Sequence, residues 1–591
     1  MSVSTLPAAA ARNPRSETRI LLVMIWAVAT FSLTMSFGMS SLSPDDAMRL
    51  VQVRDLLAGQ SWYDLTQYRL DPPHGVVTHW SRLVDLPLAL MIGSLKLVMP
   101  QATAEKITLA LWPTALLFAY LAGIVQIARP LAGETAARIA LVFAVLMAPV
   151  LQHFRIDSIH HHNVQIVLIV WTLALLLRGG VRALGVAGGL AALSVAVGQE
   201  MAPVVAALAV VVAARWIAAG EGAARGTITF GLAIGIGVLL LALATVPPAD
   251  YFAVHCDALS IAQAGALALG GFGLAIAAAL PLNTVAARAG AAAVLAALLA
   301  AAVGTGAPQC LADPYAQLDP RLVTLWLASV SEARSALAML HDLPQQVPAT
   351  FGVPFAALVL GVIQCRRTSD AQRWRWIAAT AAQAMFVAIA LWQLRGSAGA
   401  NAVAAALFPA ALAACLPARE NAPFGLNRAA LIALLIVNPV SLLALGSAAA
   451  RAFAHESRFV TSGDAGTCQQ AADYAPLARL PRGRVLAFID AGPFILMQSD
   501  DAAFGAPYHR NGAGNLAILD VFLAAPTEAA RQMAAHGIDY VAFCPGSPER
   551  YQYARLAPQG LAAALAKGDA PAFLARVPAA GTDLVLYRVR R

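Results

Sequence analysis

The stretch NVQIVLIVWTLALLLRGGVRALGVAGGLAALSVAVGQEMAPVVAALAVVVAARWIAA, residues 163–219, decides the class of this fold. It holds three apolar segments, at 163–178, 183–199 and 201–219, which are separated by short polar breaks. An apolar segment of roughly 20 residues is long enough to cross a lipid bilayer as a helix. Because such segments recur along most of the chain, we expect a polytopic α-helical membrane protein.

The composition of the whole chain agrees with this class. Of its 591 residues, 59% are hydrophobic and only 12% are charged, and the mean hydropathy is +0.68. A typical soluble domain carries about 25% charged residues. The formal net charge of +8 does not indicate a nucleic-acid partner, because the chain has no basic run with interleaved aromatic residues.

We expect about thirteen transmembrane helices. Besides the three already given, they are predicted at 20–40, 106–128, 135–151, 227–246, 263–281, 285–304, 347–364, 375–393, 398–417 and 428–449. With residues 1–19 in the cytoplasm, nearly every short loop on that side carries arginine, as the positive-inside rule predicts. The abundance of alanine suggests a GC-rich bacterial genome, so the predicted location is the bacterial inner (plasma) membrane.

Four larger pieces are predicted on the opposite, periplasmic side: the first loop 41–105, the loop Gln152–His162, the stretch 305–346 and the tail 450–591. In the first loop, the apolar run Leu83–Pro100 is short and contains a lysine, which favours a helix along the membrane interface. The tail alternates strand-like and helix-like patterns. We therefore predict three regions: a tail at 1–19, a membrane domain at 20–449 and a small α/β domain at 450–591.

The tail pattern comes from four segments. RVLAFID (484–490), IDYVAFCPG (538–546) and DLVLYRVR (583–590) are typical of buried strands, and PTEAARQMAAHG (526–537) is typical of an amphipathic helix.

The cysteines are divided between the two sides of the predicted membrane. Cys256 and Cys310 fall in neighbouring outer loops, and Cys468 and Cys544 both fall in the tail. An oxidising compartment would permit the disulfides 256–310 and 468–544. Four free buried cysteines are the alternative, because spacing does not establish pairing.

Two adjacent carboxylates open the first outer loop, in SLSPDDAMRLVQVRDLL (41–57). Pro44 can start a helix, and an aspartate at a helix start often caps the first turn. One of Asp45 and Asp46 can therefore cap the helix while the other faces a cleft. A carboxylate at the membrane surface could accept a proton from an acceptor hydroxyl or amine, so both are candidate catalytic bases.

The second outer loop, HFRIDSIHHHNVQ (153–165), contains three adjacent histidines and an aspartate, which is unusual in so apolar a chain. Histidine and carboxylate bind metals or act as general acids and bases. Asp157 and His161 could share a helical face at i, i+4, and a solvated polar loop is the alternative. The candidate metal ligands are Asp157, His160, His161 and His162.

Other polar residues are predicted to contact a phosphate or sugar. Arg395 stands at an outer helix end before small residues (396–399), and arginine recognises phosphate in bidentate fashion. The alternative is a structural Arg395–Glu200 pair. The further candidate contacts are His79 and Arg82 in the first loop, Glu200, and the tail-loop residues His509, Arg510 and Asn511.

Together these features resemble the GT-C class of integral-membrane glycosyltransferases, such as the oligosaccharyltransferase catalytic subunit and the bacterial aminoarabinose transferase. The resemblance implies that Asp45 or Asp46 is the catalytic aspartate and that RIDSIHHHN (155–163) matches an acidic motif that helps to hold a divalent cation, Mg²⁺ or Mn²⁺. It also implies that Arg395 contacts the phosphate of a lipid carrier. The "DAG" of Asp490–Gly492 lies where oligosaccharyltransferases carry Trp-Trp-Asp-Tyr-Gly, but the paired tryptophans are absent.

The sequence thus predicts an inverting glycosyltransferase that uses a polyprenyl-(pyro)phosphate-linked sugar at the outer face of the membrane. Its expected partners are this donor, a lipid, glycan or protein acceptor, and membrane lipids, with no nucleic acid. Two other classes remain open: a transporter or flippase for a lipid-linked or envelope component, and a non-catalytic assembly or export protein.

Overall fold

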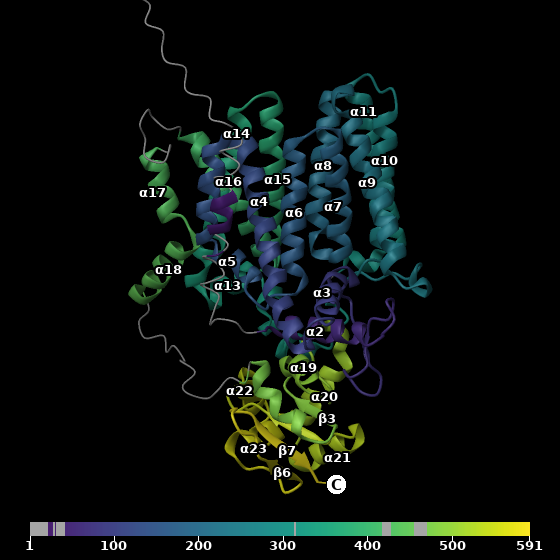
Figure 1. The fold of residues 1–591 in the computed structure, drawn as a ribbon, viewed down its shortest axis with the longest axis vertical. Helices are drawn as coiled ribbons and strands as arrows, with labels where there is room; N and C mark the ends of the chain where they lie inside the picture. Colours follow the sequence, from purple (N-terminus) through teal and green to yellow (C-terminus); the bar gives the residue numbers. More distant parts are fainter. Residues whose placement is uncertain are drawn as a thin grey trace, which may run out of the picture.

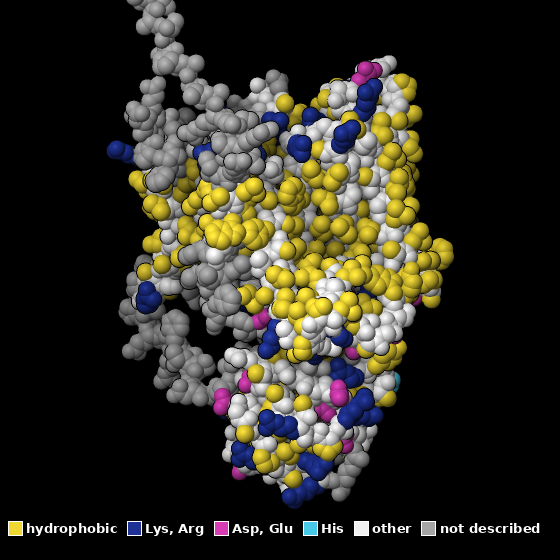
Figure 2. All heavy atoms as spheres, viewed as in Figure 1, with side chains coloured by type: hydrophobic (Ala, Val, Ile, Leu, Met, Phe, Trp, Pro, Cys, Tyr) yellow, Lys and Arg dark blue, Asp and Glu magenta, His cyan; other side chains and the backbone are white. Residues whose placement is uncertain are grey.

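The protein has two parts, a bundle of long helices and an α/β region at one end of it (Figure 1). The computed structural model describes residues 22–27, 30, 42–312, 315–416, 427–453, 468 and 470–590. The predicted tail 1–19 lies outside these residues, as does most of the predicted span 20–40. On the face drawn in Figure 2, hydrophobic side chains form a broad belt across the bundle, whereas the α/β region carries charges of both signs.

Within the described residues, nine helices are long and apolar enough to cross a membrane, and a bent pair would make a tenth span. The nine are α4 Gln101–Phe143, α6 His161–Arg178, α8 Ala202–Ala219, α9 Glu221–Thr245, α10 Ile261–Ala279, α11 Val285–Gly306, α14 Val347–Arg367, α15 Asp370–Trp392 and α16 Gly396–Cys415. The bent pair is α17 Arg428–Ile436 and α18 Pro439–Phe453. The chain is therefore a multi-pass membrane protein, but the expected thirteen spans are not confirmed.

The differences from the predicted spans have local causes. The predicted spans 106–128 and 135–151 lie on either side of a break inside α4, where Ala132 and Gly133 leave helical geometry. Gly133 has a φ of 82°, which glycine adopts readily. α7, Val181–Val197, corresponds to the span 183–199 but has only 17 residues. The span 428–449 bends by 60° before Pro439, which cannot continue the helical hydrogen bonds.

Shorter helices occupy the segments between the spans. In the first loop, α2 Pro44–Leu57 begins with Ser43 as N-cap and Pro44 in its first turn, and α3 Arg82–Leu95 corresponds to the predicted interface helix. The strands β1 Thr66–Gln67 and β2 Val76–Val77 pair antiparallel between them. The other short helices are α5 Ala148–Leu151, α12 Pro320–Leu325 and α13 Ala336–Asp342.

The α/β region is built on a five-stranded sheet of order β4-β3-β5-β7-β6. Its strands are β3 Arg484–Ala487, β4 Ala502–Ala503, β5 Tyr540–Phe543, β6 Leu574–Val577 and β7 Val585–Val589. β3 pairs parallel with β4 and β5, and the β5–β7 and β7–β6 pairs are antiparallel. Its helices are α19 Gly492–Gln498, α20 Gly512–Leu523, α21 Pro526–His536, α22 Pro548–Leu556 and α23 Leu561–Lys567. The predicted strands β3, β5 and β7 and the predicted helix α21 are all present.

The first loop attaches this region to the bundle. Leu70 forms a parallel bridge with Ala503, beside β4, so the loop extends the edge of the sheet. Arg69 donates to the carbonyls of Leu496 and Ser499 at the end of α19, and Arg54 donates to the Met497 carbonyl at 2.7 Å. Cationic side chains at a helix C-terminus satisfy its free carbonyls. α19 is therefore held against α2.

Both predicted disulfides are present. Cys256 pairs with Cys310, and Cys468 pairs with Cys544. Cys365 and Cys415 are free. The first disulfide joins the loop after α9 to the segment after α11. Both segments lie beside the site described below.

Close helix packing in the bundle depends on glycine. A Cβ atom on Gly271 of α10 would lie 2.5 Å from the Gly231 carbonyl oxygen of α9. Small residues at such crossings let two helix backbones approach, which drives helix association in membranes.

We therefore expect Gly271→Val to force α9 and α10 apart and to lower the free energy of unfolding by about 1–3 kcal/mol. Gly265→Val on the same helix is the matched control, because no atom lies within 4 Å of its Cβ position. Thermal unfolding in detergent measures both variants. Equal melting temperatures for the two variants would contradict the packing role of Gly271.

Candidate active site

Asp46 joins the first outer loop to the histidine loop. One carboxylate oxygen, Oδ2, accepts from the backbone N–H and the hydroxyl of Ser43, at 3.2 and 2.6 Å, and so completes the N-terminal cap of α2. The other, Oδ1, accepts from the backbone N–H groups of Ile159 and His160, at 2.7 and 2.9 Å, and contacts the His160 Nδ1 at 2.8 Å. Only 3% of Asp46 is exposed. Both carboxylate oxygens of Asp46 are therefore occupied by hydrogen bonds that hold the first loop against the histidine loop.

Asp45 is in a different environment, although it is the adjacent residue. It lies among Glu332, His160 and His162, whose charges act on its carboxylate. Burial raises the pKa of Asp45 to about 6, and the charge of Glu332 adds to the rise. The sequence left open which aspartate caps the helix. In the structure Ser43 is the N-cap and Asp46 completes its capping box, so Asp45 is the carboxylate available for chemistry.

The three consecutive histidines contact three different carboxylates. His160 contacts Asp46, His161 lies 3.5 Å from Glu200, and His162 lies 3.5 Å from Glu332. The reason is local geometry: His160 is the extended N-cap of α6, and His161 and His162 are its first two residues. Successive positions on a helix point in different directions.

Asp157 does not share a helical face with His161. It has a φ of 77° and precedes the start of α6, so the i, i+4 geometry is wrong. Its backbone N–H donates to the Leu109 carbonyl at 3.0 Å. Within the described residues, the ligand atoms of Asp157, His160, His161 and His162 do not converge as a metal site would require.

Glu332 is a site residue that the sequence did not indicate. It lies in the stretch 305–346 as an isolated glutamate without a motif, so no local signal marks it. Burial acts to raise the pKa of Glu332. The charge and hydrogen bond of His162 and the charges of His153 and Arg395 act in the opposite direction and hold this pKa well below its usual value. Its backbone carbonyl also accepts from the Arg395 N–H at 3.0 Å. Long-range backbone contacts of this kind appear only in the folded chain.

Arg395 stands beside this cluster. Its Nη2 donates to the Tyr315 hydroxyl at 2.6 Å, and its buried Nε has no hydrogen-bond partner among the described residues. The alternative Arg395–Glu200 pair is not formed, because Glu200 contacts His161 and accepts from Gln165. An arginine with an unused donor next to a histidine cluster suits an anionic ligand.

The small residues after Arg395 serve the packing of two helices. A Cβ on Gly396 would lie 2.6 Å from the Ala390 backbone nitrogen, and one on Gly399 would overlap the Phe386 ring. They allow α16 to pack against α15.

His79 belongs to a second cluster that joins three distant segments. The ligand atoms of His79, Asp257 and His509 lie within 4.8 Å of one another, the single such group among the described residues. Asp257 already accepts from Arg510 in bidentate fashion, at 2.6 Å for both bonds, and contacts His509 Nε2 at 2.7 Å. Burial, followed by the charge of His509, lowers the pKa of His79 to about 3, so His79 is neutral. Because Arg510 neutralises Asp257, this cluster holds the tail loop against the first loop without needing a metal.

Two of the residues that were predicted to contact a phosphate or sugar have structural roles instead. Arg82 is 1% exposed and directs its guanidinium to Asp85 and to the backbone carbonyls of Trp62 and Asp64. Asn511 is also 1% exposed and donates to the Phe504 carbonyl and to Asn515. The donors of both side chains are used inside their own loops.

We expect Asp46→Ala to lower the free energy of unfolding by about 3 kcal/mol, because it leaves the buried N–H groups of Ile159 and His160 without an acceptor. Asp45→Ala is the matched control and should unfold at or near the wild-type temperature. Thermal unfolding in detergent distinguishes the two, and equal losses would contradict the separate roles.

The stabilisation by Asp46 should also depend on pH. Burial opposes its ionisation, but the charge and hydrogen bond of His160 and the bonds from Ser43 and Ile159 lower the pKa of Asp46 to about 2. Its contribution is therefore complete above its usual pKa of about 4. The contribution is lost as the pH falls toward 2, and Asp46→Ala should show no such loss.

No protein-family model and no curated protein matches this sequence. Solved structures do match. The archaeal oligosaccharyltransferase AglB from Archaeoglobus fulgidus, in complex with an inhibitory peptide and a dolichol-phosphate, is similar with a TM-score of 0.67 at 13% identity, over 95% of this chain and 73% of that one. The same enzyme tethered to an acceptor peptide gives 0.65 at 14% identity, over 98% and 74% of the chains. Its complex with Zn and sulfate gives 0.61 at 16%, over 96% and 73%. This chain therefore has the fold of the oligosaccharyltransferases, a fold of the GT-C glycosyltransferase class, as the sequence resemblance implied.

Proposed function

We propose that this protein is an inverting glycosyltransferase that moves a sugar from a polyprenyl-(pyro)phosphate donor to an envelope acceptor. The observation that carries the proposal is the gathering of Asp45, Glu332, His162 and Arg395 at the end of the bundle that the α/β region covers. These residues come from four segments far apart in the sequence. A transporter would instead need polar groups along a path through the bundle.

Asp45 is the proposed general base. Its pKa of about 6 leaves it largely deprotonated at neutral pH and basic enough to take a proton from the attacking hydroxyl or amine. As the acceptor attacks the anomeric carbon, the bond to the carrier phosphate breaks on the opposite face. Burial of the carboxylate among helices keeps water from competing with the acceptor.

Arg395 is the proposed phosphate contact, and neutral His79 is a further hydrogen-bond donor near the α/β region. Charge develops on the leaving phosphate as the sugar departs, and a preorganised cation stabilises that charge. Support comes from the buried Nε of Arg395, which has no partner among the described residues.

A divalent cation, Mg²⁺ or Mn²⁺, is proposed beside Glu332, near the carrier phosphate. Burial raises the pKa of Asp45, and repulsion by the nearby charge of Glu332 raises it further. Glu332 also lies 3.5 Å from His162. Carboxylate oxygen and imidazole nitrogen are ligands for such ions. Glu332 would hold the ion, and Asp45 would stay available as the base. When bound, the ion would neutralise phosphate charge.

The acceptor is proposed only by class: a lipid, a glycan or a protein. The peptide in the archaeal structures belongs to those enzymes. The proposed location is the bacterial inner membrane, with the site and the α/β region on the periplasmic side. Mass spectrometry of envelope glycolipids from cells with and without the protein tests the activity, and identical profiles of lipids, glycans and glycoproteins would contradict it.

We expect Asp45→Asn to lower the transfer rate at least about 100-fold, the lower bound for a general base, without changing the melting temperature. Asp500→Asn, an exposed aspartate of the α/β region, is the matched control and should keep full activity. In the wild type, the rate should fall as the pH drops below about 6, because Asp45 becomes protonated. Full activity of Asp45→Asn would remove the proposed base.

Removal of divalent cations with EDTA should abolish transfer, and Mn²⁺ or Mg²⁺ should restore it. Glu332→Gln should raise the cation concentration needed for half-maximal rate, because it removes one charged ligand. Undiminished activity in EDTA would show that the chemistry needs no metal.

A further inference from the structure

The two disulfides differ in how easily a reductant can reach them. Cys468 and Cys544 lie in the core of the α/β region and are 6% and 3% exposed. Cys256 and Cys310 are only partly buried, and the residues on either side of Cys310 are exposed. Thiol–disulfide exchange needs a direct approach of a thiolate to one of the two sulfurs, so the exposed disulfide is the labile one. A reductant should therefore open the 256–310 disulfide first.

This disulfide joins two segments that have little regular structure of their own. The segment 246–260, between α9 and α10, contains no helix or strand apart from one 3₁₀ turn. Cys310 lies in another single turn, 308–311. Bonds from Ser260 and Gln263 to a backbone carbonyl hold the first segment at its α10 end. For the rest of both segments, the covalent bond is a main restraint on their conformation.

Asp257, the residue after Cys256, is the contact of the first segment with the α/β region. Its carboxylate accepts two bonds from Arg510, both at 2.6 Å, and lies 2.7 Å from the His509 Nε2. The side chains of Asp257 and Arg510 are 26% and 21% exposed. Ion pairs that solvent reaches stabilise little once the cost of ordering both partners is included. The disulfide lowers that cost, because it already restricts the chain beside Asp257.

The second segment reaches the proposed phosphate contact. Tyr315 follows Cys310 in the chain, and its hydroxyl accepts a hydrogen bond from the Arg395 Nη2 at 2.6 Å. The ring of Tyr315 also lies edge-on to the ring of His509, with the centroids 6.3 Å apart. The disulfide therefore ties the segment that holds the α/β region to the segment that contacts Arg395.

We propose that the Cys256–Cys310 disulfide is a redox switch that controls how the α/β region is attached over the candidate active site. A thiolate of a dithiol reductant attacks one sulfur and breaks the Sγ–Sγ bond, and the second thiol of the reductant then resolves the mixed disulfide. The two cysteines gain two electrons and two protons, and the dithiol becomes a disulfide. The restraint on Asp257 and Tyr315 is then lost, and the inference rests on the proposed function only where it concerns transfer activity.

Alkylation after reduction tests which disulfide opens. The full chain in detergent, with its free thiols blocked beforehand, is incubated with dithiothreitol, and new thiols are alkylated and quantified by mass spectrometry. The 256–310 pair should become alkylated at least about tenfold faster than the 468–544 pair, because access limits exchange. Cys365→Ser/Cys415→Ser, which removes the two free thiols, is the matched control and should behave as the wild type does.

Hydrogen exchange tests the consequence for the tail loop, residues 506–511, in which the backbone N–H groups of Tyr508 and Asn511 are hydrogen-bonded. After reduction this loop should exchange at least about tenfold faster, because the loss of a disulfide usually favours opening by more than that factor. Cys256→Ser/Cys310→Ser should show the fast exchange without a reductant and no further change with one. If this variant does not fold, the reduced wild type supplies the measurement.

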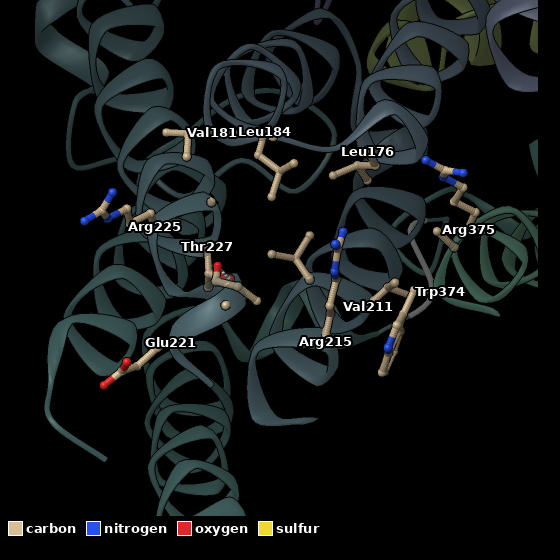
Figure 3. Close-up of a pocket in the computed structure, with 16 residues that line it drawn as sticks. Leu176, Val181, Leu184, Val211, Arg215, Glu221, Arg225, Thr227, Trp374 and Arg375 are labelled. Carbon is tan, nitrogen blue, oxygen red and sulfur yellow. Dashed lines mark hydrogen bonds between the residues drawn. The ribbon is translucent and has the colours of Figure 1, made fainter. Parts of the chain in front are cut away.

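The far end of the bundle provides the internal reference for this exchange. α6 begins at His161 in the candidate site, and an 18-residue helix is about 27 Å long. Where α6 ends at Arg178, a cavity of about 190 Å³ is lined by residues of α6, α7, α8, α9 and α15 (Figure 3). Exchange in the segments around this cavity should not change on reduction. Faster exchange there as well would show general unfolding and would overturn the switch.

Transfer activity separates this inference from the proposed function. Reduction should lower the transfer rate, and oxidised glutathione should restore it. Absence of transfer in both forms would contradict the proposed function, and the exchange of 506–511 would then decide the switch by itself. Full transfer by the reduced chain, unchanged exchange of the tail loop once the 256–310 disulfide is open, or equal rates of opening for the two disulfides would each overturn the switch.

Discussion

The contact of Asp46 with the histidine loop is the constraint on which the site depends. One oxygen closes the start of α2, and the other accepts two backbone N–H groups just before α6. α2 carries Asp45, and α6 carries His161 and His162. A single buried carboxylate therefore fixes the relative position of a catalytic candidate and of the histidines around it. Charge-assisted hydrogen bonds in a low-dielectric interior are strong enough for this role.

The α/β region completes the site through several weaker links. Arg54 and Arg69 hold the end of α19, and Asp257 binds His509 and Arg510 of the tail loop. Asp257 is next to Cys256, whose disulfide with Cys310 ties its loop to a neighbouring segment. The covering region is thus attached from more than one side. A site built this way can exclude water while its parts come from separate segments of the chain.

Sequence patterns were reliable where one segment carries the whole signal. Apolar length predicted most spans, and short apolar runs typical of buried strands predicted β3, β5 and β7. They failed where a tertiary contact decides: the roles of Arg82 and Asn511 follow from neighbours in space. The small residues after Arg395 are a further example, since they serve the packing of α16 on α15. Glu332 had no local signal at all.

The sequence by itself determined the membrane class, the places of the polar loops between the apolar segments, and the residue types available for chemistry, because hydrophobic length and charge act locally along the chain. The tertiary structure decided which aspartate caps and which is free, which carboxylate each histidine meets, and that Glu332 belongs to the site. These outcomes depend on distances between segments that are far apart in the sequence. A one-dimensional pattern does not contain such distances, since the packing of the helices sets them.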